Sequence, residues 1–111
     1  MKQGEIWLVN YPEGAGHEYF KERPALVVES DEQIAKTKIF TVMAMTSNAN
    51  NRVVDDILIT MDKYNNLHSD SVLKTHHIQS FDISRFMKRI GKVKDEILVG
   101  VKQYLKIHFG L

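Results

Sequence analysis

His17, Glu18 and Arg23 bring an imidazole, a carboxylate and a guanidinium within seven residues of one another near the start of the chain. Their segment is polar and contains glycines, and it lies between two apolar stretches, residues 5–11 and 25–28. Loops held between buried strands commonly carry binding or catalytic residues. Cleavage of RNA without a metal needs a general base, a general acid, and a cation or hydrogen-bond donors at the phosphate. The three side chains of this segment supply one group for each of these roles: a general base, a general acid and a cation.

Arg23 is the strongest single candidate in this loop. Its planar guanidinium matches two phosphate oxygens and stays charged at physiological pH, and Pro24 biases it towards an extended conformation. The alternative is a surface arginine paired with Glu22 or Glu18. An unperturbed histidine such as His17 titrates near neutral pH and can act as base or acid, or it is an exposed histidine without a role. Glu18 acts as a base only if burial or a neighbour raises its pKa, and otherwise orients Arg23.

Further candidates are suited to contacting the substrate. Thr46 ends an apolar stretch and is followed by Ser47, so its hydroxyl can donate to a phosphate oxygen; the alternative is that both residues open a turn. Tyr19 and Phe20 are difficult to explain as core in a polar loop, and aromatic rings stack on unpaired RNA bases. Lys21 adds a cation beside them. We therefore expect this loop to meet a substrate or a partner.

The adjacent pair His76 and His77 raises the question of a metal site. Neighbouring strand residues point to opposite faces, so the two imidazoles cannot readily bind one ion. His68 and Asp70 are better spaced, but no further residue completes a set of ligands. We expect no metal and no cofactor. One of the two adjacent histidines could still face the active loop.

Strand patterns dominate the first three quarters of the chain, and both faces of the first strand are apolar. We expect strands over residues 5–11, 25–29, 39–46, 56–61, 71–75, 78–81 and 88–93. Asp82 is placed to cap one helical turn over residues 83–87. No long helices alternate with the strands, which argues against a parallel α/β sheet. The pattern predicts a small, curved antiparallel sheet that closes into a barrel.

The end of the chain changes from strand to helical periodicity. Apolar side chains recur at helical spacing and form one stripe, at residues 97, 98, 101, 104, 105 and 108. Asp95 and Glu96 complement the helix dipole at the start, and Lys106 and His108 complement it at the end. Gly110 is placed as the C-terminal cap. We expect an amphipathic helix on the barrel and, because both strand faces are apolar, a homodimer.

Composition excludes some classes of protein and leaves others open. The 111 residues favour one domain over 1–111, and the absence of cysteine fits a reducing compartment. We expect no signal peptide and no membrane span, and a cytoplasmic location. A net charge of +1 is too balanced to identify a nucleic-acid binder by charge alone. The basic cluster over residues 85–94 is either a solvated face or a phosphate contact.

Several short motifs, in their order and spacing, resemble the MazF/PemK family of bacterial toxins, which are ribonucleases. The motifs are GEIWLV at 4–9, GHE at 16–18, RPALVV at 23–28 and TS at 46–47, with weaker similarity over 78–85 and 90–92. The resemblance implies an SH3-like β-barrel with a C-terminal helix, forming a symmetric dimer. It also implies the toxin role in a type II toxin–antitoxin system.

The implied activity is metal-independent, sequence-selective cleavage of single-stranded RNA that leaves a 2′,3′-cyclic phosphate and a 5′-hydroxyl. By the resemblance, Arg23 is the phosphate clamp, Thr46 is a supporting donor, and His17 and Glu18 help to bind or activate the substrate. The substrate-binding set would comprise Tyr19, Phe20, Lys21, Ser47, His76 and Gln79. The implied partner is an antitoxin whose acidic tail competes with RNA for the same cations.

Two departures from the family pattern bear on the activity. Many relatives carry an Asp-Gln pair and then an arginine in the later strand, where this chain has His76, His77, Ile78 and Gln79. Either His76 replaces the aspartate that is a proposed base in some members, or the base comes from the first loop. Relatives also tend to have Gln and Gly after the His-Glu pair, which implies a different base preference here.

Two alternatives to the ribonuclease remain. The missing Asp-Gln pair allows an inactive barrel that binds RNA or a partner without turnover. The ending at residues 109–111, Phe-Gly-Leu, faintly resembles the tail of CcdB-type poisons of DNA gyrase. A helix cap with one apolar anchor explains that ending equally well, and the first loop matches the ribonuclease branch better.

Overall fold

A computed structural model describes residues 1–13, 21–48, 50 and 52–111 of the chain. The strands are β1 (Glu5–Tyr11), β2 (Lys21–Val27), β3 (Ile39–Thr46), β4 (Ile57–Ile59), β5 (Ser71–Asp82) and β6 (Phe86–Lys92). The helices are α1 (Asp31–Ile34), the 3₁₀ turn η2 (Ile83–Arg85) and α2 (Asp95–Phe109). The first-loop candidates His17, Glu18, Tyr19 and Phe20 lie outside the described residues.

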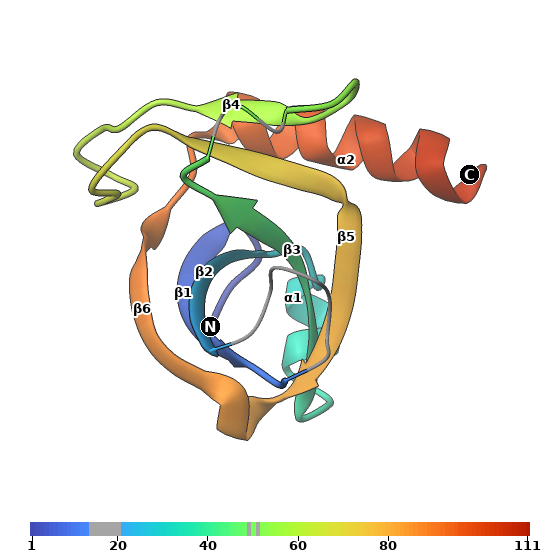
Figure 1. Ribbon diagram of the computed structural model, residues 1–111. Helices are drawn as coiled ribbons and strands as arrows, with labels where there is room; N and C mark the ends of the chain where they lie inside the picture. The colour runs from blue at the N-terminus through green and yellow to red at the C-terminus, as the bar shows by residue number, and fades with distance from the viewer. Residues whose placement is uncertain (14–20, 49, 51) are drawn as a thin grey trace.

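The strands form one antiparallel sheet with the order β4-β5-β3-β2-β1-β6. The sheet curls on itself into a half-barrel, and α2 lies across one side of it, next to β4 and the start of β5 (Figure 1). The prediction of a mainly β fold with a curved antiparallel sheet and a C-terminal helix is therefore confirmed.

Some element boundaries differ from the sequence prediction. The two strands expected over 71–75 and 78–81 are one strand, β5, because both halves pair with β3 across an irregularity between Met43 and Met45. The helix α1 was not predicted; the Ser30 side chain caps it by accepting a hydrogen bond from the Gln33 backbone N–H at 3.2 Å. The turn capped by Asp82 is confirmed, as a shorter 3₁₀ turn.

The sheet is apolar on both faces, and each face has its own hydrophobic cluster. Along β2, Leu26 packs with Ile6 on the face covered by α2, whereas Ala25 and Val27 belong to the cluster on the opposite face. This alternation follows from the two-residue period of a strand. It explains why β2 and β3 read as continuous apolar stretches.

Helix α2 is attached to the sheet by its predicted apolar stripe. Val101 and Tyr104 are buried against the first cluster, and Gly110 ends the helix in the left-handed conformation at φ 68°. The Tyr104 hydroxyl is hydrogen-bonded to Nδ1 of His76 on β5 at 3.0 Å and to Nδ1 of His108 at 2.9 Å. Within the described ranges, no helix is long and apolar enough to cross a membrane.

Candidate active site

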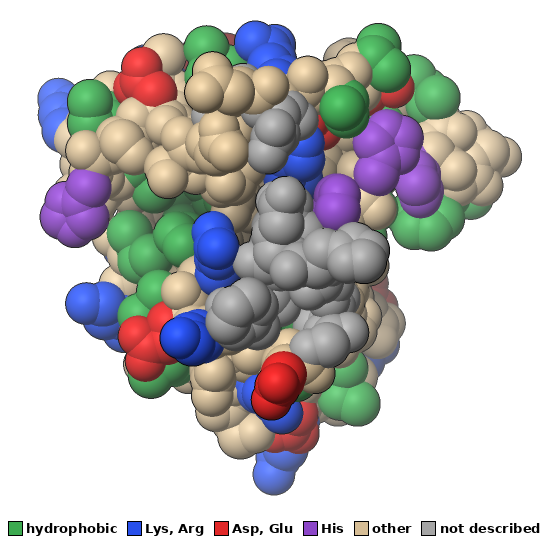
Figure 2. Space-filling model, viewed as in Figure 1, with side chains coloured by type: hydrophobic (Ala, Val, Ile, Leu, Met, Phe, Trp, Pro, Cys, Tyr) green, Lys and Arg blue, Asp and Glu red, His purple; other side chains and the backbone are tan. Residues whose placement is uncertain are grey.

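A cavity of about 480 Å³ opens where strands β2 and β3 separate. Its volume is in the range of pockets that enclose a small ligand, about 300–1,000 Å³. It is lined by β1, β2, β3, β6, the connection between β4 and β5, and the start of β5, through Leu8, Arg23, Pro24, Met45, Thr46, Ser47, Asn66, Leu67, His68, Ser69, Ser71, Lys88, Arg89 and Ile90. On the face of the molecule that Figure 2 shows, apolar side chains and basic side chains lie next to each other.

The strand register explains why Arg23 and Thr46 share this cavity. Strands β2 and β3 pair at Ala25 with Ala44 and at the two following positions of β2. Extending that register by two residues past Ala25 sets Arg23 opposite Thr46. Beyond Ala25, Pro24 is the first residue of β2 that is not paired with β3, although it is paired with Leu8 of β1. Proline has no backbone N–H to donate to a neighbouring strand. The two strands therefore separate there and leave both side chains at the opening.

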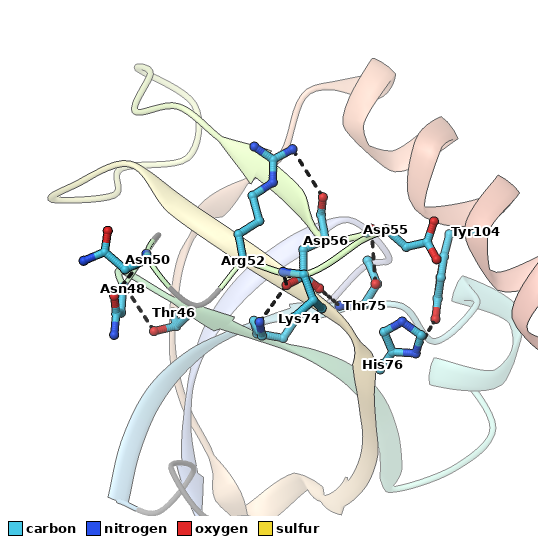
Figure 3. Close-up of polar contacts among 11 residues, drawn as sticks. Thr46, Asn48, Asn50, Arg52, Asp55, Asp56, Lys74, Thr75, His76 and Tyr104 are labelled. Atoms are coloured by element: carbon cyan, nitrogen blue, oxygen red, sulfur yellow. Dashed lines mark hydrogen bonds and ion pairs between the residues drawn. The ribbon is translucent and has the colours of Figure 1, made fainter.

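The Thr46 hydroxyl is held in place by the chain that follows it. Its Oγ1 accepts a hydrogen bond from the Asn48 backbone N–H at 3.1 Å, and the Asn48 side chain accepts one from the Asn50 backbone N–H at 3.1 Å (Figure 3). The side chain is buried, and no acceptor for its own hydrogen is found among the described residues. The hydroxyl can therefore donate to a ligand in the cavity.

The charge of the cavity is positive. Among the described residues, the ionisable side chains of the lining are Arg23, His68, Lys88 and Arg89, and this part of the lining contains no carboxylate. Arg89 is paired with Glu5 at 2.8 Å, whereas Arg23 and Lys88 form no ion pair within the described ranges. Burial raises the pKa of the Glu5 carboxyl, but hydrogen bonds from Trp7 and Arg89 hold that pKa below its ordinary value. The cavity is therefore suited to an anion.

A buried ion pair anchors the connection that follows Thr46 to strand β5. Lys74 Nζ lies 2.6 Å from Oδ2 of Asp56, which also accepts a hydrogen bond from the Val53 N–H at 3.0 Å (Figure 3). Thr75 Oγ1 donates to the Asp55 carbonyl at 3.2 Å. Burial alone would raise the pKa of Asp56, but the hydrogen bonds from Lys74 and Val53 and the charge of Lys74 keep it below its ordinary value.

The structure separates the other predicted residues. Ser47 lines the cavity with Arg23 and Thr46. Lys21 lies at a different hollow beside Tyr11, although it is only two residues from Arg23. His76 and Gln79 lie on β5, away from the cavity lining; Gln79 is aligned with Val42 of β3, and His76 is bonded to α2.

The connection between β4 and β5 was not predicted to line the site. It supplies Asn66, Leu67, His68 and Ser69 to the cavity. The only sequence signal was the turn-forming pair of asparagines at 65 and 66. His68 and Asp70 were considered only as possible metal ligands. Nothing in the sequence indicates that their segment folds towards Arg23.

Comparison with known proteins identifies the family. Residues 2–109 match the family model described as the PemK-like, MazF-like toxin of type II toxin–antitoxin systems. The chain belongs to this toxin family. Among its relatives, endoribonuclease MazF9 of Mycobacterium tuberculosis is 29% identical over 116 residues, covering 100% of this chain and 98% of that protein. Endoribonuclease PemK of Escherichia coli is 28% identical over 99 residues, covering 88% and 74%.

Solved structures of the family share this fold. The crystal structure of MazF from Deinococcus radiodurans has a TM-score of 0.83 at 23% identity and covers 100% of this chain and 97% of that chain. A mycobacterial endoribonuclease in complex with its cognate antitoxin has a TM-score of 0.76 at 14% identity and covers 100% and 96%. The expected resemblance to MazF/PemK toxins is thus confirmed at the level of family and fold.

Proposed function

We propose that this chain is the toxin of a type II toxin–antitoxin system and an endoribonuclease that cleaves single-stranded RNA selectively and without a metal. The observation that carries the proposal is that Arg23 and Thr46 line one cavity with cationic side chains and without a described carboxylate. A phosphodiester is the anion that such a cavity fits, because guanidinium and hydroxyl donors both match its oxygens. Cleavage of mRNA would inhibit translation and growth.

The reaction begins with attack of the RNA 2′-hydroxyl on the adjacent phosphorus and yields a 2′,3′-cyclic phosphate and a 5′-hydroxyl. Arg23 binds the phosphate and stabilises the charge that builds up in the transition state. Thr46 donates a hydrogen bond to a phosphate oxygen, and Ser47 supports it from the next position. By family resemblance, His17 and Glu18 activate or bind the substrate.

RNA on either side of the cleaved bond is bound by residues outside the cavity. Tyr19 and Phe20 are proposed to stack on unpaired bases. Lys21 is proposed to contact the RNA backbone, since it lies two residues from Arg23 on β2. His76 and Gln79 would then contact nucleotides further from the scissile phosphate.

Two protein partners are proposed with this activity. One is an antitoxin with an acidic tail, whose carboxylates would compete with RNA for Arg23 and Lys88. The other is a second copy of the chain, supported by large apolar side chains that remain exposed, including Val54 at 80%, Ile107 at 80% and Leu111 at 89%. We propose that the system acts in the bacterial cytoplasm.

Incubation of the purified protein with mixed single-stranded RNA and a chelator tests the function. Mapping of the new ends should give 5′-hydroxyls and cyclic phosphates at a recurring sequence. Arg23→Ala and Thr46→Ala should each lower the cleavage rate about 10²–10³-fold, the usual effect of removing a donor from a developing oxyanion. Circular dichroism should show an unchanged fold.

Matched controls lie just after helix α1. Lys36 makes an exposed ion pair with Glu32, and the Thr37 hydroxyl donates to the Ile39 carbonyl, both outside the cavity. Lys36→Ala and Thr37→Ala should leave the cleavage rate unchanged. Full activity in both Arg23→Ala and Thr46→Ala would refute the site, and RNA binding without turnover by the unchanged protein would favour an inactive binding barrel.

A further inference from the structure

The connection between β4 and β5 is a tightly bonded wall of the cavity. Asn65 is completely buried at its centre, and its Nδ2 donates to the Thr60 carbonyl at 2.9 Å. Its Oδ1 accepts hydrogen bonds from the backbone N–H groups of Asp62 at 3.2 Å and Leu67 at 3.0 Å. The Asp70 carboxylate accepts from the Met61 N–H at 2.9 Å and joins the two ends of the segment. Such bonds fix the backbone from which neighbouring side chains project.

Strand β6 holds the same wall from the other side. Asn66 Nδ2 donates to the Ile90 carbonyl at 2.9 Å, and the Lys92 N–H donates to the Tyr64 carbonyl at 3.0 Å. A Cβ built at Gly91 would lie 2.5 Å from the Tyr64 carbonyl oxygen, so the two backbones are in direct contact there. The wall is therefore attached to the strand that also supplies Lys88 and Arg89 to the cavity.

His68 projects from this wall at a defined position. Leu67, immediately before it, packs against the hydrophobic cluster under α2. The Ser71 hydroxyl, a few residues later, donates to the Ser69 carbonyl at 3.1 Å. His68 itself is exposed and lines the same cavity as Arg23 and Thr46. A long polymer can thus reach the imidazole, while the backbone beneath it is anchored on both sides.

The chemistry of the described lining singles out this imidazole. The other ionisable lining residues are Arg23, Lys88 and Arg89, and guanidinium and ammonium groups ordinarily hold their protons at neutral pH. Histidine is the side chain that ordinarily gains and loses a proton between pH 5 and 8. We propose that His68 transfers a proton to or from the reacting phosphodiester, a role that rests on the ribonuclease function proposed above.

The two proton transfers of the reaction define what His68 can do. The 2′-hydroxyl loses its proton as the O2′–P bond forms, and O5′ gains a proton as the P–O5′ bond breaks. No oxidant or reductant takes part. A neutral imidazole accepts the first proton as general base, whereas a charged imidazole supplies the second as general acid. Arg23 and Thr46 then remain bound to the phosphate oxygens through both steps.

Steady-state kinetics on an RNA oligonucleotide containing the mapped cleavage site test this role. His68→Gln should lower kcat/KM by about 10²–10⁴-fold, the usual contribution of a general acid or base. It should also remove one limb of the pH–rate profile. Affinity for the same oligonucleotide with a 2′-deoxy group at the cleavage site should be unchanged, because proton transfer is not part of binding. A purely structural role would alter the affinity and leave both limbs in place.

A second oligonucleotide distinguishes acid from base. It carries sulfur in place of the bridging O5′, and a thiolate leaves without needing a proton. Recovery of the cleavage rate by His68→Gln on this substrate identifies His68 as the general acid. A persistent defect together with the lost pH limb identifies it as the general base. Either result supports the proposal.

Further variants separate failure of this inference from failure of the proposed function. His108→Gln, a matched change on α2 outside the cavity, should cleave at the unchanged rate. If His68→Gln cleaves normally and keeps both limbs of the pH–rate profile, the proposal is overturned while the ribonuclease function stands. Absence of cleavage by the unchanged protein overturns both, and that result appears before any variant is made.

Discussion

Lys74 and Asp56 carry opposite charges in a place from which water is almost excluded, with side chains 8% and 1% exposed. Removing two charges from water costs several kcal/mol for each ion, and the pair recovers this only with close geometry and further hydrogen bonds. Asp56 has those bonds, from the backbone N–H groups of Val53 and Thr75. The pair therefore holds the chain after Thr46 in one place, and loss of either partner leaves a buried charge unmatched.

We expect Lys74→Met to lower the free energy of unfolding by about 3–5 kcal/mol, the usual cost of breaking a buried ion pair from one side. Urea denaturation at pH 7 measures this change in the free energy of unfolding. Lys36→Met removes an exposed ion pair with Glu32 and should cost at most about 1 kcal/mol. Equal effects of the two substitutions would show that Lys74 and Asp56 are not buried as described.

The same variant should weaken the contribution of Asp56 to the pH dependence of stability. In the unchanged protein the pKa of Asp56 lies below its ordinary value, so its contribution is present above about pH 4 and is lost as the pH falls through the folded-state pKa. Without Lys74, burial is opposed only by the backbone hydrogen bonds from Val53 and Thr75, so the pKa of Asp56 should rise and the stability that Asp56 contributes above about pH 4 should shrink. Denaturation series from pH 3 to 7 on both proteins compare the slopes.

Single residues differ in how much the sequence revealed about them. The family resemblance implied that Arg23 and Thr46 act together, whereas their residue types alone left a surface ion pair for Arg23 and a turn at Thr46 as alternatives. The position of His68 could not be predicted, because it depends on a loop that folds back against β6. The position of Lys88 could not be predicted either, because it depends on the pairing of β6 with β1. Asp56 and Lys74 were also missed, since a charged residue within an apolar stretch does not reveal its partner.

At the scale of elements, Gly91 is the contact between β6 and the wall that carries His68. We expect Gly91→Ala to lower the free energy of unfolding by about 1–3 kcal/mol, because the added methyl group meets backbone atoms that cannot rotate away. The shifted wall should also reduce RNA cleavage. Thermal unfolding and the cleavage assay measure the two effects.

Gly100 provides the matched control on helix α2. A Cβ there meets nothing within 4 Å, so Gly100→Ala should raise the free energy of unfolding by about 0.5–1 kcal/mol through helix propensity. Cleavage should be unaffected. If both glycine variants are stabilised, the close approach of β6 to the loop is refuted.

The elements themselves were largely predictable. The C-terminal helix and the β3 strand were found at nearly their full lengths, because apolar periodicity over many residues identifies both. Strand β5 was divided in two, since Thr75, His76 and His77 are polar residues in a strand that does not alternate there. Helix α1 is a single turn held by the Ser30 cap, and it carries no apolar stripe from which to predict it.

At the scale of the whole molecule, charge is distributed unevenly even though the net charge is only +1. Arg23 and Lys88 stand unpaired among the described residues of the cavity, whereas several other cations are matched by carboxylates. Binding of the uncleavable RNA should therefore weaken with salt, through release of counterions from the RNA.

Removal of the Arg23 guanidinium should change how strongly RNA binding depends on salt. The slope of log K against log salt concentration should become less steep by about 0.7 for each phosphate contact removed from a single strand. Fluorescence anisotropy between 50 and 200 mM salt is a suitable measurement, with Lys36→Ala as the variant of unchanged slope. An unaltered slope for Arg23→Ala would show that this guanidinium does not contact a phosphate.

Strand β1 lies between β2 and β6, with Glu5 aligned with Lys92 from the far end of the chain. The amino end leaves the ribosome first. The edge of β1 that pairs with β6 therefore has no partner until almost the whole polypeptide has been synthesised. Lys88 and Arg89 reach the cavity only at that point. On the ribonuclease function proposed above, a nascent copy therefore lacks one wall of the cavity for most of its translation, which would delay cleavage of the message that encodes it.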